Sequence, residues 1–295
     1  MNEDSMNEEG EKEGKAGLDM QDPLFLVGEI AQSVDLHPQT VRYFDSRGVV
    51  VPYKDKNTGR RKYSIYDLYK ITLRSQYQNL GFSVAETEEI FKKTKLEEII
   101  SGLHVKEREL ENERLDLELR QAGLQNMLER MERIETCSGR YRYLDKPAMW
   151  RHPHMKDGKV LMDTGSVQAR KAGMERMPLS VYSFHFDHAD IAGGPGPEVC
   201  RWDMALPAPY AELTGFHKIP GAYLEPERRC LYTVFEQEGT LLLTWDVISQ
   251  ETKSFLDGNG LVLCGDVEGT IIINTLDEKR RQKRYFEVWL PVEAK

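Results

Sequence analysis

The sequence predicts a multidomain fold of the α plus α+β class: an N-terminal winged helix-turn-helix, a long helix and a C-terminal α+β domain. Three observations support this. Residues 25–91 carry a helix-turn-helix pattern and a basic hairpin, residues 96–131 have leucine or methionine at every seventh position, and short aromatic-rich strands follow from residue 146. The chain has 295 residues, 40% of them hydrophobic, which suits two cores and a connector. We therefore expect segments at 1–23, 24–95, 96–137 and 146–295.

Charge is distributed unevenly along the chain. The net charge is −9, yet residues 1–22 hold eight acids against two lysines, and residues 37–75 hold nine Lys and Arg against three Asp. The acidic segment has too few apolar residues to fold, so residues 1–23 are predicted to be a disordered tail. This tail either keeps the protein soluble or screens the basic patch. The basic segment favours a nucleic acid partner, because such binding depends on the local patch and not on the total charge.

Membrane, metal and cofactor chemistry find no support in the sequence. No apolar run approaches the roughly 20 residues that span a bilayer, and the acidic N-terminus is unlike a secretory signal, so we expect a cytoplasmic protein. The four cysteines (Cys137, Cys200, Cys230, Cys264) are far apart and form no C-x-x-C. This spacing argues against a structural zinc site, and we predict no cofactor and no metal.

Two short helices are predicted at the start of the folded region. Residues 27–34 place apolar side chains on one helical face, residues 35–37 make a turn, and Pro38 opens the second helix. Val41 and Phe44 point inward. The outer surface of the second helix then offers Gln39, Thr40, Arg42 and Tyr43. Arg and Gln can read base edges in a major groove, and Thr and Tyr can bond phosphates, although many surface helices carry such residues without binding DNA.

A basic hairpin follows. Residues 53–63 have turn residues at their centre and Lys or Arg on both sides, including Arg60 and Arg61. Directly after a helix-turn-helix, such a hairpin is interpreted as a wing that reaches along a nucleic acid backbone. Ser64 is predicted to cap a helix ending near Leu80, and Ser83 with Glu86 forms a capping box for the next helix.

The motifs together resemble the MerR family of transcription regulators. The matching phrases are residues 40–44 (TVRYF), Gly59-x-Arg61-x-Tyr63 and residues 81–83 (GFS). The resemblance implies that Arg42 and Tyr43 form the recognition-helix pair and that Arg61 and Tyr63 contact DNA phosphates, with Arg60 adding charge. It also implies a promoter as the target and RNA polymerase as a partner.

The seven-residue repeat predicts a dimerisation helix. Leu96, Leu103, Leu110, Leu117 and Leu124 are followed by Met131, and the intervening sequence is rich in charge. A helix of this length with one narrow apolar stripe is unstable alone, so a coiled-coil homodimer is expected. By family resemblance it is antiparallel, and it implies a near-palindromic operator. The alternative is that the helix packs against its own chain.

From residue 146 onward the pattern changes to strands and helices. Strands are predicted at 179–186, 199–204, 231–235 and 285–290, and helices at 166–177 and 240–256. A connection is expected over the polar residues 138–145. Helices among antiparallel strands indicate an α+β domain.

Behind a MerR-type head, this domain resembles the GyrI-like effector-binding domain, notably in residues 285–292 (YFEVWLPV). The resemblance implies a cleft for a small-molecule effector, lined by aromatic and acidic side chains. The candidate effector-binding residues are Tyr182, Trp202, Tyr232, Glu268, Tyr285 and Glu287. Most aromatic residues of this kind belong simply to the core.

The acidic positions depart from the family pattern. They fall on Gly269 and Lys283, with Glu268 one residue away, where a strand would turn its side chain to the opposite face. A neutral or anionic effector thus becomes as plausible as a cationic one. Glu287 either replaces a missing acid or forms a salt bridge to a nearby arginine.

The function implied is a ligand-responsive DNA-binding transcription regulator that binds and distorts a promoter as a homodimer. One alternative is a DNA-binding regulator whose C-terminal domain serves protein interaction. Another is a GyrI-like hydrolase using Glu287, but no Ser/His/Asp constellation is present, so we predict no catalytic residues and no enzyme activity.

Overall fold

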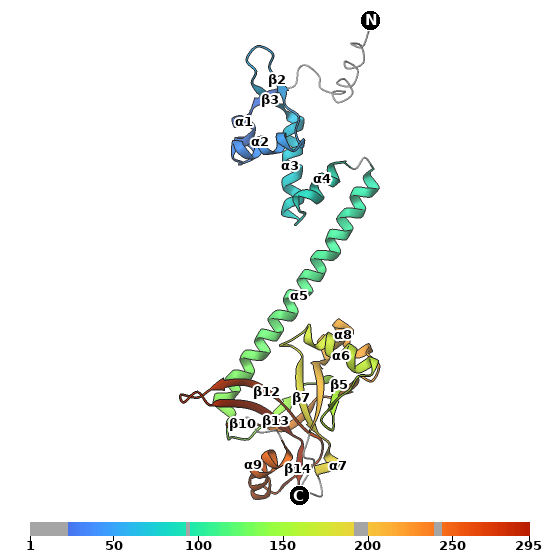
Figure 1. Cartoon of the computed structure of the whole chain (residues 1–295), viewed down its shortest axis with the longest axis vertical. Coiled ribbons are helices and arrows are strands. Elements are labelled where there is room, and N and C mark those ends of the chain that lie inside the picture. The colour runs from blue at the N-terminus through green and yellow to red at the C-terminus, as the bar shows by residue number, and fades with distance from the viewer. Residues whose placement is uncertain (1–22, 93–94, 192–199, 239–243) are drawn as a thin grey trace. The chain divides into compact units, whose positions relative to one another are not determined.

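The computed structural model describes residues 23–92, 95–191, 200–238 and 244–295 (Figure 1). The chain divides into two compact units, Met1–Asn112 and Glu113–Lys295. The predicted disordered tail lies outside the described residues except for its last position. Residues 199 and 240, where a strand and a helix were predicted to begin, also lie outside them.

The first unit contains a small sheet and the predicted helices. The sheet has the order β1-β3-β2 and is antiparallel. The elements of the first unit are β1 (Leu24–Leu26), α1 (Val27–Ser33), α2 (Pro38–Ser46), β2 (Tyr53–Lys54), β3 (Arg61–Ser64), α3 (Ile65–Asn79), α4 (Val84–Lys92) and the start of α5 (Leu96–Cys137).

Local sequence explains where the helices of the first unit begin. His37 caps α2 by accepting from the Gln39 amide, and Pro38 takes the first helical position. Ser64 and Asp67 form a capping box for α3, and the predicted box of Ser83 and Glu86 precedes α4. These interactions satisfy amides that would otherwise lack partners at the helix starts.

The core of the first unit fixes the angle between α1 and α2. Ile30 from α1 and Val41 from α2 are fully buried, and Phe44 and Ile71 complete the contact with α3. The predicted inward-facing residues of the second helix are therefore confirmed.

The second unit is built on one large antiparallel sheet. Its strand order is β4-β10-β13-β12-β7-β8-β5-β6, and β9 also pairs with β5. The elements are β4 (Arg142–Lys146), β5 (Met149–Lys156), β6 (Lys159–Val160), α6 (Thr164–Met174), β7 (Val181–Phe186), α7 (His188–Ile191), β8 (Arg201–Pro207), α8 (Ala208–Thr214), a 3₁₀ turn (Phe216–Lys218), β9 (Tyr223–Glu225), β10 (Arg228–Glu238), α9 (Trp245–Gly258), β11 (Leu261–Leu263), β12 (Val267–Leu276), β13 (Gln282–Leu290) and β14 (Val292–Ala294).

Helices cover this sheet at separate places. In Figure 1, α9 lies at the end of the domain near β14, and α6 and α8 lie near β5. Trp245 and Ile248 of α9 enter a core with Phe186 and Phe286 of the sheet. A helix-containing domain with an antiparallel sheet agrees with the prediction of a C-terminal sheet-rich region.

The second half of α5 also packs on the second unit. Leu119 joins a core with Leu179 and Met204, and Cys137 joins another with Tyr232. A Cβ at Gly123 would lie 3.2 Å from the Leu179 amide nitrogen, so the helix approaches the chain closely there. The long helix is confirmed over residues 96–137, and its C-terminal half belongs to the second unit.

The predicted connection at residues 138–145 is corrected by β4. This strand starts at Arg142 and pairs with β10, with Leu144 opposite Cys230. The polar sequence resembles a linker because Arg142, Tyr143 and Asp145 of this edge strand are exposed, while Lys146 is buried. The second unit therefore begins well before residue 146.

No helix among the described residues combines the length and apolar character needed to cross a bilayer. All four cysteines are free thiols, three of them buried.

Candidate functional site

The predicted DNA-contacting residues of α2 lie mostly on its outer face. Gln39 and Arg42 are exposed, and the Arg42 guanidinium donates to the Gln39 side-chain oxygen at 3.1 Å. Tyr43 is 47% exposed, whereas Thr40 is half-buried. The exposed face thus presents one guanidinium, one amide and one phenol, all able to hydrogen-bond a base edge or a phosphate.

The hairpin forms as predicted and is closed by Asp55. The backbone amides of Asn57 and Thr58 donate to its carboxylate at 3.0 Å, and Lys62 pairs with it at 2.8 Å. The Lys62 ammonium and these amides hold the pKa of Asp55 well below its usual range. Gly59 takes a left-handed conformation at φ +66°, which favours glycine.

An ion pair connects the hairpin with α2. Arg61 lies 3.1 Å from Asp45, and half of the Arg61 side chain remains exposed. Arg42, Arg60, Arg61 and Tyr63 line one surface hollow of the first unit. The fold therefore brings these four predicted residues together.

Tyr63 differs from its predicted role. Its ring is fully buried in the core of the first unit, so the ring itself is not available to DNA. Its hydroxyl has no hydrogen-bond partner among the described residues, and burial raises the pKa of that hydroxyl. The hydroxyl is buried together with the ring, so neither part of the side chain is exposed for the predicted phosphate contact.

Arg74 is a basic residue that does not belong to the surface. Although it contributes to the basic charge of residues 37–75, it is 2% exposed and its guanidinium lies 4.1 Å from the Phe44 ring centroid. Burial lowers its pKa. Its contact is a cation–π interaction beneath α2, so the exposed basic patch is smaller than the sequence count.

The heptad leucines of α5 are exposed. Leu96, Leu103, Leu110, Leu117 and Leu124 are between 37% and 66% exposed, whereas Leu119 is buried. Residues 117 and 119 are about 200° apart around a helix. Packing on the same chain therefore uses a different face from the heptad stripe.

A cavity of about 70 Å³ lies inside the second unit, between α5 and the sheet. Its charged lining comes from three segments distant in sequence: Arg130 from α5, Lys146 and Arg151 from β4 and β5, and Glu268 and Glu287 from β12 and β13. Thr270 pairs opposite Glu287, and Glu268 pairs opposite Trp289, which places these residues on one face of the sheet.

Both glutamates of the cavity are buried and paired. Glu287 accepts from Arg130 at 2.7 Å and from the Tyr232 hydroxyl at 2.9 Å. Glu268 forms ion pairs with Lys146 and Arg151. Burial, with the Glu287 carboxylate beside it, raises the pKa of Tyr232 well above its usual range.

The predicted acidic positions need correction. An added Cβ at Gly269 would collide with the Glu287 backbone oxygen and the Phe184 ring, so no side chain fits there. Glu268 instead reaches the cavity. Lys283 lies on another part of β13, pairs with Glu236 at 2.7 Å and does not line the cavity. Of the two alternatives for Glu287, a replacement acid or a salt bridge to an arginine, the structure shows the salt bridge, which is formed with Arg130.

The aromatic candidates are distributed over different parts of the domain. Tyr232 is not part of the cavity lining, but its hydroxyl donates to Glu287, which lines the cavity. The Tyr182 ring lies tilted against His154, with ring centroids 4.9 Å apart, and Trp202 packs edge-on against Phe184 at 6.1 Å. Tyr285 lies beneath the Lys283 ammonium. Tyr182, Trp202 and Tyr285 do not line the cavity.

Sequence reasoning missed the cationic side of the cavity. Asn126 and Arg130 are four residues apart on α5 and so share a face, and Arg151 is a charged residue at a buried strand position. A buried charge in a strand pattern signals a paired or functional group. The signal was therefore present at Arg151, but the partner residues become visible only in the fold.

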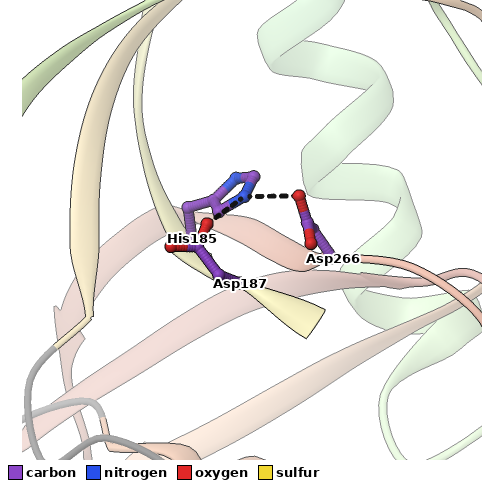
Figure 2. A group of neighbouring side chains, drawn as sticks. All are labelled: His185, Asp187 and Asp266. Atoms are coloured by element: carbon purple, nitrogen blue, oxygen red, sulfur yellow. Dashed lines mark hydrogen bonds and ion pairs between the residues drawn. The ribbon is translucent and has the colours of Figure 1, made fainter. Parts of the chain in front are cut away.

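Another charged cluster lies at the opposite end of β7. Figure 2 shows the His185 imidazole between two carboxylates, with Nε2 3.1 Å from Asp266 and 3.3 Å from Asp187. These residue types can ligate metals, but Arg201 already lies 2.7 Å from Asp187, and the His188 amide donates to Asp266. We therefore interpret the cluster as an ion-pair network.

Comparison with known proteins concerns mainly the first unit. Residues 25–94 match the family model described as MerR HTH family regulatory protein. The HTH-type transcriptional regulator HmrR of Rhizobium leguminosarum bv. viciae is 31% identical over 64 residues, which are 22% of this chain and 49% of that protein. The chain thus spans about half the length of this relative.

Solved structures show weaker likeness. The cryo-EM structure of the EcmrR–DNA complex in EcmrR-RPo aligns at a TM-score of 0.34 and 16% identity, over 91% of this chain and 99% of that chain. A MerR-family transcriptional regulator from Bacillus cereus aligns at a TM-score of 0.32 and 22% identity, over 37% and 84%.

The likeness to the MerR family comes from the sequence match over residues 25–94 and not from these structural scores. The matched segment contains both helices of the helix-turn-helix, the hairpin and the helices α3 and α4. Residues 25–94 are therefore similar in sequence to the helix-turn-helix region of MerR-family regulators.

Proposed function

We propose that this protein is a ligand-responsive, DNA-binding transcription regulator that acts as a homodimer. The observation that carries the proposal is the joint surface of α2 and the hairpin. Arg42, Arg60 and Arg61 line one hollow within the region that matches the MerR family. The relative HmrR is itself described as an HTH-type transcriptional regulator.

The two elements would divide the work of recognition. Gln39 and Arg42 on α2 would read base edges in the major groove, with Tyr43 and Thr40 bonding phosphates. Arg60 and Arg61 on the hairpin would contact the backbone, which adds affinity without sequence preference.

The exposed heptad leucines support the homodimer. A second copy of α5, running antiparallel, would cover an apolar stripe that packing on the same chain leaves in solvent. Two heads related by twofold symmetry would then bind a near-palindromic operator. Bending and untwisting that DNA would bring promoter elements into phase for RNA polymerase.

The cavity of the second unit supports ligand response. Asn126 and Arg130 of α5 line it together with residues of the sheet. A ligand there would contact the same helix that carries the dimer stripe. Binding would shift the dimer between two arrangements that differ in their DNA geometry.

A fluorescence anisotropy titration tests this function. The purified protein is titrated with DNA from upstream of its own coding sequence, with random DNA as competitor at fixed salt. We expect saturable binding that random DNA displaces poorly, with two chains per site. Equal affinity for both DNAs, in a protein shown to be folded and dimeric, would contradict specific regulation of that promoter.

A further inference from the structure

We propose that the cavity between α5 and the sheet binds a small oxyanion, meaning a carboxylate or phosphate group, and not a lipophilic cation. This inference rests on the proposed function, since it takes the C-terminal domain to be the sensor. It follows from the charge of the cavity, the occupation of its acids, its unpaired polar atoms and its size.

The lining of the cavity has an excess of positive charge. Three cationic side chains, Arg130, Lys146 and Arg151, face two carboxylates, Glu268 and Glu287. All five are less than one-fifth exposed. Glu225, which is not part of the lining, also pairs with Lys146 and Arg151, so the cations outnumber the acids only among the groups that face the cavity. In a poorly solvated site this local excess favours an anion.

Neither glutamate is available to a cationic ligand. Both oxygens of Glu287 are engaged, one by Arg130 and one by Tyr232. Both oxygens of Glu268 are engaged too, one by Lys146 and one by Arg151. A cation would have to displace groups that already carry the same charge.

Hydrogen-bond donors, by contrast, remain in excess. A guanidinium has five N–H donors and an ammonium three. The described bonds of Arg151 go to Glu225 and Glu268, and its Nη1 atom is buried without a hydrogen-bond partner, 3.8 Å from Asp203. The buried Asn126 side-chain oxygen, also on the cavity lining, has no partner either. A small oxyanion that also carries a hydroxyl could accept from the Arg151 Nη1 atom and donate to the Asn126 side-chain oxygen.

The size of the cavity points the same way. Pockets for drug-sized ligands measure roughly 300–1,000 Å³, whereas this cavity measures about 70 Å³. It has room for a group such as phosphate or a short carboxylate, and a large aromatic cation would require the sheet and α5 to separate.

Glu287 would act as an internal competitor for the ligand. Its carboxylate occupies Arg130, the cationic residue that α5 contributes, at 2.7 Å. An incoming oxyanion would take over part of that interaction. Removing the Glu287 charge should therefore strengthen anion binding, an outcome that misfolding would not produce.

Isothermal titration calorimetry without DNA tests the inference. Inorganic phosphate and acetate are the anionic probes, and tetramethylammonium is the cationic probe, all in Tris chloride at constant ionic strength. We expect at least one of the two anions to bind and tetramethylammonium not to bind. Glu287→Gln should tighten anion binding about threefold or more, and Arg130→Gln should weaken it about tenfold, as expected for a charge-assisted hydrogen bond.

Arg229→Gln is the matched control, because Arg229 forms an exposed ion pair with Asp145 at 3.7 Å and is not part of the cavity lining. It should leave binding unchanged. Binding of tetramethylammonium alone, no anion binding to either wild type or Glu287→Gln, or weaker anion binding in Glu287→Gln would each overturn the inference. Since DNA is absent, failure here is distinct from failure of the regulatory function.

Discussion

Arg42 and Arg61 share a surface but have different surroundings. Arg42 projects from the exposed face of α2 and contacts only Gln39 among the described residues by a side-chain hydrogen bond. Arg61 belongs to the hairpin and is tied to Asp45 of α2. Under the proposed function, Arg42 would read bases, and Arg61 would bind the DNA backbone while its ion pair with Asp45 connects the hairpin with α2.

Arg42→Ala should weaken binding to the operator by about 1–3 kcal/mol and change binding to random DNA little, because it would remove the proposed base contact. Arg61→Ala should weaken binding to all sequences and lower the salt dependence by about one unit of slope. Anisotropy titrations at several salt concentrations measure both effects. Arg229→Ala removes an equal charge from the second unit and should change neither the affinity for the operator nor the salt dependence. Equal losses of affinity for the operator and for random DNA in Arg42→Ala would refute the proposed base contact of Arg42.

The carboxylate of Asp266 offers a pH-dependent test of the cluster in Figure 2. The hydrogen bond with His185 is the main cause that lowers the pKa of Asp266 to about 2, and the His188 amide adds to it against the effect of burial. Because the folded pKa lies below the unfolded value of about 4, the ionised group stabilises the fold above that pH. This stabilisation is lost as pH falls from about 4 through 2.

Asp266→Asn should therefore be less stable than the wild type at pH 7, and the difference should shrink below pH 4. Urea unfolding at a series of pH values measures it. Asp145→Asn, at an exposed ion pair, is the control and should show a smaller difference. A difference for Asp266→Asn that stays constant down to the lowest pH would contradict the ionic role of this carboxylate.

At the scale of elements, α5 has a buried face and a separate exposed leucine stripe. Leu119 and Gly123 face the second unit, and the heptad leucines face solvent. The sequence repeat and the alternative of packing on the same chain were opposed in the prediction. In the structure, α5 packs on its own chain through residues outside the heptad stripe. The same helix could therefore pack on its own chain and also form a dimer through its leucines.

Leu117→Glu should dissociate the dimer. Burying a leucine contributes about 2 kcal/mol per chain, so losing two of them raises the dissociation constant several hundredfold. Sedimentation velocity across a concentration series measures this change. Leu213→Glu makes the same substitution at an exposed position of α8 and should leave the association state unaltered; an unchanged dimer in Leu117→Glu would exclude the heptad seam.

Most elements could be predicted because their signals are local. Pro38, Ser64 and Ser83 mark helix starts through capping chemistry that needs only neighbouring residues. The edge strand β4 was missed because its outward residues give it the polarity of a linker. The cationic half of the cavity was missed since Arg130, Lys146 and Arg151 meet only after three distant segments pack together.

At the scale of the whole molecule, the end of α5 is part of the second unit. Leu119 and Cys137 complete two of its cores, and β4 pairs along β10. A fragment of residues 113–295 should unfold in one cooperative thermal transition. A fragment of residues 146–295 should lose cooperativity, because it lacks these side chains and most of β4.

Calorimetry and circular dichroism of the two fragments check this prediction. Equal melting temperatures and equally sharp transitions would mean that the helix adds nothing to the stability of the domain.

The shared position of α5 has a consequence for building chimeric regulators. If the second unit is grafted onto the DNA-binding domain of another protein, it must carry the helix from residue 113 onward, because the unit begins inside α5. The junction then falls within the heptad repeat, between Leu110 and Leu117. The other protein must therefore supply the first part of the helix in the same seven-residue phase. Otherwise the apolar stripe of the hybrid helix will be interrupted at the junction.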